Sequence, residues 1–241
     1  MPRPIATDDL AEGDGVVRTT DAGQMGRRVA FDVDAVVFDC DGVLVDSTES
    51  VERCMRDWAE RFDLDGDAIL LEAHGRTSRS TAERWLPPEV VDAAAALMEA
   101  IEISDAASVR ELPGARALLA AIPADRWAVV TSGTRPLFEA RITAAALPKP
   151  LIVMTADDVA RSKPDPEGYA RALRLLGADP DRALVFEDAA AGITAARAAR
   201  VRWVVRIGEG GPIAGEDAVI SNLGQASWTG RLELEGGGWR R

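Results

Sequence analysis

Two aspartates one position apart, Asp39 and Asp41, directly follow a short apolar run, 35–38. An apolar run of this kind is typical of a buried parallel strand, and ligands of open α/β sheets bind at the carboxyl ends of such strands. Because neighbouring carboxylates repel each other, both stay ionised only beside a cation, and a hard divalent ion with oxygen ligands suits them. The pair predicts a metal or catalytic site, although it also fits a strand that ends in an acidic turn.

Polar groups that suit a phosphoryl group occur later in the chain. Thr131 comes after the apolar run 127–130 and carries a hydroxyl beside the backbone amides of Ser132 and Gly133, which can hold a phosphoryl oxygen. Such residues are common in turns, so this signal is weak by itself. Lys163 stands just before a predicted helix in a segment with two prolines, whereas a lone lysine is usually solvated.

Glu187 and Asp188 follow the apolar run 183–186 and bring two more acids to the same edge of the sheet. Alone, this pair would also fit a helix cap. Asp39, Thr131 and Glu187 each follow an apolar run that is predicted to be a strand, and the carboxyl ends of parallel strands meet at one edge of the sheet. We therefore expect one site that combines carboxylates, an ammonium group and a hydroxyl.

Strands and helices are expected to alternate in the second half of the chain, as they do in βαβ units. Strands are predicted at 34–39, 127–130, 151–154, 183–186, 202–207 and 218–220. The predicted fold class is α/β, with a Rossmann-like parallel sheet core and helices on both of its faces.

A helical insert is predicted directly after the first strand. Val51, Met55, Trp58 and Phe62 are spaced so that they share one face of an amphipathic helix, and we expect this face to be packed. An insert of this size can close over the edge of the sheet as a lid. The sequence therefore predicts a small helical cap domain.

Four parts of the chain are expected. Residues 1–33 show no sustained apolar period, which predicts a flexible extension or, alternatively, an arm that binds a partner. The catalytic core is expected at 34–46 and 112–225, the cap at 47–111 and a C-terminal tail at 226–241.

Composition narrows the class of protein. A chain of 241 residues with 47% apolar residues can bury a large core, and its net charge of −12 argues against nucleic acid or an anionic membrane as the main partner. A single histidine nearly excludes His-based metal or triad chemistry, and two cysteines cannot form a disulfide framework. Because no apolar run of about eighteen residues and no signal pattern occur, we expect a cytoplasmic protein.

The string Asp39-x-Asp41-Gly-x-Leu-x-Asp46-Ser47 resembles the first motif of the haloacid dehalogenase superfamily, in the version with a small helical cap. Thr131, Lys163 and the pair at 187–188 match the other three motifs in order. The strings at 130–135, 155–159, 163–169 and 186–193 resemble phosphatases of small sugar and polyol phosphates, including glycerol-phosphate and deoxyglucose-phosphate phosphatases. The resemblance spans roughly 34–206.

The cap contains a further similarity to that group. His74, Gly75 and Arg76 resemble its cap loop, and the resemblance implies that these residues select the substrate. Ser80 departs from the pattern, because an acid is expected there. The departure leaves the substrate open, while the chemistry at the sheet edge does not depend on it.

The resemblance also implies roles for the residues of the core. Asp39 is expected to attack phosphorus, and Asp41 to act as general acid and base. Mg²⁺ is expected on the Asp39 carboxylate, the Asp41 backbone carbonyl and Asp188, with Glu187 near the ion or alternating as a ligand. The phosphoryl oxygens are expected on Thr131, Ser132 and Lys163.

The function implied is a Mg²⁺-dependent phosphatase that hydrolyses a small sugar or polyol phosphate through an aspartyl phosphate, as a monomer or weak dimer. A mutase of the same fold would be expected to carry a histidine about twelve residues after the nucleophile, where this chain has Val51. A dehalogenase would need neither the metal nor Asp41. A non-catalytic protein that binds a phosphorylated metabolite is the alternative from another class.

Overall fold

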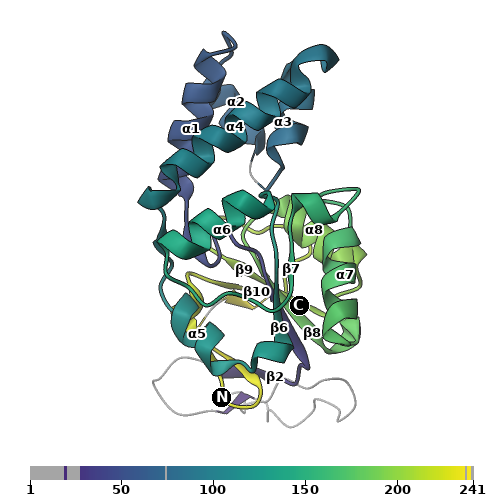
Figure 1. The fold of residues 1–241 in the computed structure, drawn as a ribbon. Coiled ribbons are helices and arrows are strands. Elements are labelled where there is room, and N and C mark those ends of the chain that lie inside the picture. Colours follow the sequence, from purple (N-terminus) through teal and green to yellow (C-terminus); the bar gives the residue numbers. More distant parts are fainter. Residues whose placement is uncertain (1–18, 21–27, 74, 237, 240–241) are drawn as a thin grey trace, which may run out of the picture.

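A parallel sheet lies at the centre of the computed structural model, which describes residues 19–20, 28–73, 75–236 and 238–239 (Figure 1). Within these residues, seven strands pair in the order β13-β10-β9-β8-β3-β6-β7, and all except β13 run parallel. The strands are β3 (Ala35–Phe38), β6 (Trp127–Val130), β7 (Val153–Met154), β8 (Ala183–Glu187), β9 (Trp203–Ile207), β10 (Ala218–Ile220) and β13 (Gly238–Trp239). The predicted α/β fold is confirmed.

Helices cover both faces of this sheet. The helices of the core are α5 (Ala115–Ala121), α6 (Arg135–Ala144), α7 (Glu167–Leu176) and α8 (Ala190–Ala198). Val36 and Phe38 of β3 pack in a cluster with side chains of α5 and α6, whereas Ala35 and Val37 pack in a second cluster with α7 and α8. Every residue of β3 is buried, because both faces of the strand are covered, and this explains its continuous apolar sequence.

The insert after β3 is helical and stands beyond one edge of the sheet (Figure 1). Its helices are α1 (Thr48–Glu60), α2 (Gly66–Ala73), α3 (Ser78–Trp85) and α4 (Val91–Asp105). Met55 and Trp58 are buried in a hydrophobic cluster of this insert, with Val51 and Phe62 packed against it. Two short antiparallel strands, β4 (Val45–Asp46) and β5 (Arg110–Glu111), join the insert to the core.

A second sheet corrects the predicted N-terminal boundary. β2 (Arg28–Phe31) pairs with β12 (Leu232–Glu235), which also pairs with β11 (Ala226–Trp228), and β1 (Thr19–Thr20) pairs with β2. Residues 28–33 are therefore part of the folded core and not of an extension, and the same holds for β11 and β12, which were predicted as part of a C-terminal tail.

The apolar pattern of this second sheet explains why the sequence did not predict it. Val29 and Phe31 alternate inward on β2, as Leu232 and Leu234 do on β12, and all four side chains join the core cluster. Two apolar residues per strand are too few to establish a period, and the pairing joins segments about as far apart as the chain allows. The other residues of the range 1–27, beyond β1, lie outside the described residues.

In the described part of the chain, no helix has the length and apolar character needed to cross a membrane.

We predict that Leu234→Ala lowers the free energy of unfolding by about 2–5 kcal/mol, because it leaves a cavity in the core. Urea-induced unfolding measures the change. Leu151→Ala is the matched control: this leucine is 72% exposed, so the same truncation should change stability by less than about 0.5 kcal/mol. Equal effects of the two substitutions would show that the C-terminal strands add nothing to the core.

Candidate active site

The ends of β3 and β8 bring two acids together. Phe38 of β3 lies opposite Phe186 of β8, and the backbone N–H of Asp39 donates to the carbonyl of Phe186 at 2.9 Å. The parallel register therefore sets Asp39 beside Glu187, as the sequence predicted for one sheet edge. Both carboxylates are buried.

Lys163 lies between these two carboxylates. Its Nζ donates to Oδ1 of Asp39 at 2.6 Å and to Oε1 of Glu187 at 2.5 Å, and its side chain is only 5% exposed. Burial alone would lower the pKa of Lys163, but the charges of the two carboxylates raise it well above its ordinary value. The ammonium group is therefore charged, and it neutralises part of the acidic cluster.

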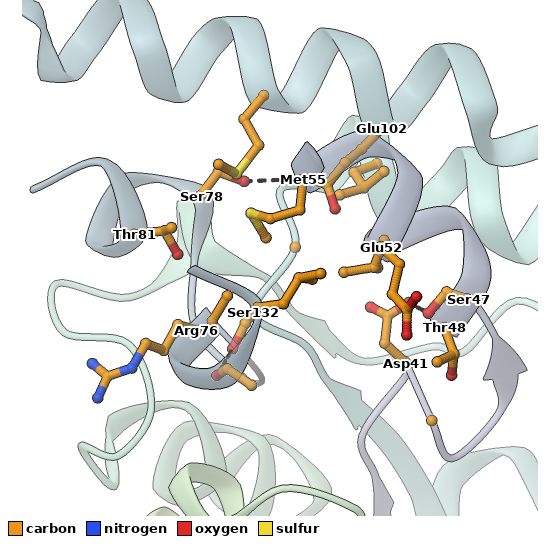
Figure 2. A pocket seen from close by; sticks show the side chains of 18 of the residues that line it. Asp41, Ser47, Thr48, Glu52, Met55, Arg76, Ser78, Thr81, Glu102 and Ser132 are labelled. Atoms are coloured by element: carbon orange, nitrogen blue, oxygen red, sulfur yellow. Dashed lines mark hydrogen bonds between the residues drawn. The ribbon is translucent and has the colours of Figure 1, made fainter. Parts of the chain in front are cut away.

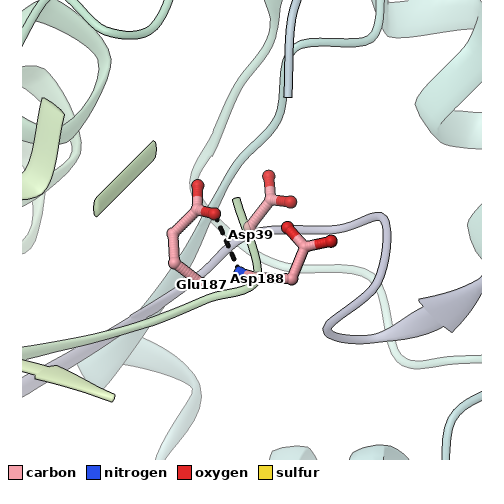
Figure 3. Close-up of side chains that lie close together, drawn as sticks. All are labelled: Asp39, Glu187 and Asp188. Carbon is pink, nitrogen blue, oxygen red and sulfur yellow. Dashed lines mark hydrogen bonds between the residues drawn. The ribbon is translucent and has the colours of Figure 1, made fainter. Parts of the chain in front are cut away.

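Asp39, Glu187 and Asp188 offer carboxylate oxygens that all lie within 4.8 Å of one another (Figure 3). Burial raises the pKa of Asp39, and the neighbouring acids at 187, 188 and 41 raise it further, against the opposing effect of Lys163. A bound divalent cation would oppose that shift, because it favours the ionised carboxylate. The donor set is made of hard oxygen ligands, so it fits Mg²⁺.

Glu187 accepts hydrogen bonds from several groups of the protein. Tyr169 donates its hydroxyl to Oε1 at 2.8 Å, and the backbone amides of Asp188 and Ala189 donate to Oε2 at 2.9 and 3.1 Å. With the bond from Lys163, both oxygens of Glu187 are engaged.

Asp41 points from the core toward the cap (Figure 2). Ser47 donates its hydroxyl to Oδ1 of Asp41 at 2.7 Å, and Arg141 on α6 donates from Nη1 to Oδ2 at 2.9 Å. Arg141 also donates from Nη2 to Oε1 of Glu102, a residue of the cap helix α4, at 2.9 Å.

Arg141 and Glu102 were not predicted from the sequence, yet each carries a signal. Arg141 shares the buried face of α6 with Phe138 and Ile142, and Glu102 shares the buried face of α4 with Met98. A charged residue on an otherwise apolar helix face is costly to bury unless it is paired. That departure from the pattern could have identified both residues.

The two predicted phosphate-binding hydroxyls have different surroundings. Thr131 is buried and its Oγ1 accepts a hydrogen bond from the backbone N–H of Gly133 at 3.0 Å. Ser132 donates its hydroxyl to the backbone carbonyl of Gly75 in the cap at 2.8 Å. Ser132 therefore links the core to the cap in this structure.

A cavity of about 170 Å³ lies between the cap and the core. Its floor includes Asp39, Asp41 and Asp188 from the sheet edge, where the predicted chemistry is concentrated. The cap contributes apolar and polar side chains to the other walls, several of which are labelled in Figure 2. These cap residues include Val51, Glu52, Met55, Leu70, Ser78, Thr81 and Met98.

The predicted cap loop borders this cavity, except that His74 lies outside the described residues. Gly75 has a φ of +73°, and a Cβ at this position would lie 2.8 Å from the Cβ of Ala189 in the core. Glycine therefore permits the close approach of the loop. Arg76 is exposed, its guanidinium points away from the cavity in Figure 2, and its Nε donates to the carbonyl of Glu72 at 3.0 Å.

Comparison with known proteins agrees with this site. A model of the haloacid dehalogenase-like hydrolases matches residues 33–200. The chain belongs to this family. The resemblance found in its motifs is thereby confirmed.

The similar proteins include two phosphatases and one mutase. Hexitol phosphatase A of Escherichia coli (strain K12) is 39% identical over 171 residues, which are 68% of this chain and 78% of that protein. Glycerol-1-phosphate phosphohydrolase 2 of Saccharomyces cerevisiae (strain ATCC 204508 / S288c) is 31% identical over 189 residues, 73% of this chain and 76% of that protein. These two relatives are phosphoric monoester hydrolases, the enzyme class predicted from the sequence.

The mutase is similar in fold. The crystal structure of β-phosphoglucomutase from Clostridium difficile has a TM-score of 0.71 and 19% identity, and the match covers 80% of this chain and 92% of that chain. At this identity the likeness concerns the fold alone.

We predict that Gly192→Ala displaces Glu187, because the added Cβ would lie 1.6 Å from Oε1 of that residue. Overpacking of this kind lowers the free energy of unfolding by about 1–3 kcal/mol. The higher helix propensity of alanine offsets only part of this loss. A displaced Glu187 moves Lys163, and a shift of catalytic groups lowers turnover by about 100-fold. Phosphate release and thermal unfolding measure the two effects.

Gly211→Ala is the control, since open space surrounds that glycine. It should leave activity and stability unchanged. A fully active Gly192→Ala protein would contradict the role of the carboxylate at 187 in holding the lysine.

Proposed function

We propose that the protein hydrolyses the phosphate monoester of a small sugar or polyol, with Mg²⁺ as cofactor and an aspartyl phosphate as intermediate. The observation that carries the proposal is the buried contact of Lys163 with Asp39, a residue that lines the cavity between the cap and the core. The similarity to hexitol and glycerol-1-phosphate phosphatases supports the substrate class. Nucleophile, cation and acid are present together at this one place.

The first half of the reaction forms the intermediate. An oxygen of Asp39 attacks phosphorus, the bond from phosphorus to the ester oxygen breaks, and the phosphoryl group is transferred to the aspartate. Asp41 gives its proton to the leaving alcohol oxygen. In this way a poor leaving group departs as a neutral alcohol.

The second half releases phosphate. Asp41, now a carboxylate, takes a proton from water while the water oxygen attacks phosphorus and the bond to Asp39 breaks. Each group then returns to its starting state. One carboxyl group therefore serves as acid first and as base afterwards.

The remaining residues bind the phosphoryl oxygens and the metal. Lys163, Thr131 and the backbone and hydroxyl of Ser132 are the proposed phosphate ligands. We assign Mg²⁺ to Asp39, the backbone carbonyl of Asp41 and Asp188, with Glu187 beside them. When bound, the ion neutralises charge that develops on the phosphoryl oxygens.

We predict that Asp39→Asn lowers turnover by at least about 1000-fold while the protein stays folded, because an amide of equal volume cannot attack phosphorus. Release of phosphate from sugar and polyol phosphates is measured together with the circular dichroism spectrum. The exposed Asp125→Asn is a matched control and should keep full activity.

A parallel assay with EDTA in place of Mg²⁺ distinguishes the role of the metal from that of the nucleophile. Activity that survives EDTA would contradict the proposed cofactor only. Wild-type turnover by Asp39→Asn would instead overturn the assignment of the nucleophile.

The mutase alternative leads to a different product. Val51 lines the cavity at the place where a mutase would be expected to carry a histidine that restrains the general acid. We therefore predict that water reaches the phosphoenzyme and that inorganic phosphate forms faster than glucose 6-phosphate. The assay supplies Mg²⁺, β-glucose 1-phosphate and a trace of the bisphosphate, and follows both products. Glucose 6-phosphate as the main early product would identify a mutase.

A further inference from the structure

Arg141 joins the proposed general acid to the cap. It belongs to helix α6 of the core, and its side chain is only 4% exposed. One end of its guanidinium contacts Asp41 and the other contacts Glu102 of α4, both at 2.9 Å. The planar fork of arginine suits this arrangement, because its nitrogens can serve two carboxylates in fixed directions.

Glu102 is fixed to the cap as well as to Arg141. Its Oε2 accepts a hydrogen bond from the hydroxyl of Ser78 on α3 at 3.2 Å, and the residue is buried. Three residues earlier on the same helix, Glu99 accepts a hydrogen bond from Thr134 of the core at 2.5 Å. This side of α4 therefore meets the core through polar contacts, and Glu102 is held by both the cap and the core.

The buried charges of this group depend on one another. A buried guanidinium is expensive unless it is paired, and removing one partner leaves an uncompensated charge. Without Arg141, the carboxylates of Asp41 and Glu102 would face each other with no cation between them. Among the described side chains, Arg141 and Ser47 donate to the Asp41 carboxylate, so the loss of Arg141 would leave Ser47.

We propose that Arg141 is a positioning residue, which fixes the carboxyl group of Asp41 in the cavity and makes that position depend on a closed cap through Glu102. The inference rests on the proposed function, in which Asp41 is the acid. Arg141 touches no reacting atom in this scheme. Its effect on the rate passes through Asp41.

The leaving group provides the test. An alkoxide needs a proton to depart, whereas a nitrophenolate leaves without one, so a misplaced acid slows the alkyl ester selectively. We expect Arg141→Met to lower kcat for sorbitol 6-phosphate by about 100-fold and kcat for p-nitrophenyl phosphate by less than about 5-fold. Arg141→Lys keeps the charge and should recover part of the loss.

A double-mutant cycle tests the path of the effect. In an Asp41→Asn background, Arg141→Met should cause no further loss on the alkyl ester, because both changes remove the same function. Arg174→Met, at an exposed arginine of α7, is the control and should match the wild type on both esters. Independent, additive losses would overturn the proposal.

Two further outcomes are informative. If Arg141→Met does not fold, Glu102→Gln replaces it, and a selective loss of kcat on the alkyl ester is again the expected result. Equal losses on both esters in an active enzyme would overturn the positioning role and leave the phosphatase function standing. A wild-type protein that releases phosphate from neither ester would refute the proposed function, and this inference with it.

Discussion

The contact of Lys163 with two buried carboxylates is the interaction on which the site depends. An ammonium group this deeply buried is tolerated only with partners of opposite charge, and Asp39 and Glu187 supply them at 2.6 and 2.5 Å. The partners stand side by side because β3 and β8 pair in one register. A slip by one residue would turn every side chain of the strand to the other face. The sheet thus fixes Asp39 through its backbone.

The same contact limits what surrounds it. Glu187 needs the space that Gly192 leaves, since any side chain there would meet its carboxylate. Tyr169 and two backbone amides complete the hydrogen bonds of Glu187. This carboxylate is therefore fixed from several directions. Among the described residues, the side-chain donors to Asp41 are Ser47 and Arg141, and Arg141 also donates to Glu102 of the cap.

The sequence predicted that Asp39 and Glu187 lie at one sheet edge because both stand at the ends of buried strands, and a continuous apolar run reveals such a strand. Arg141 and Glu102 were missed, since a helix pattern shows that a charge lies on an apolar face but not which distant charge it meets. The small sheet was missed because two inward residues such as Val29 and Phe31 establish no period. The cap loop shows a third limit: the motif identified Arg76, but its side-chain direction depends on the helices around it.

The cap carries a hydrophobic cluster of its own, which in the described residues comes entirely from positions 51–101. Hydrogen bonds join the cap to the core at Ser132, Thr134 and Arg141. The chain itself passes between the two parts through the paired strands β4 and β5. The apolar interior of the cap is therefore separate from the two apolar clusters of the core. Substitutions within this cluster should therefore leave the packing of the sheet intact, whereas a change at Glu102 would reach Asp41 through Arg141.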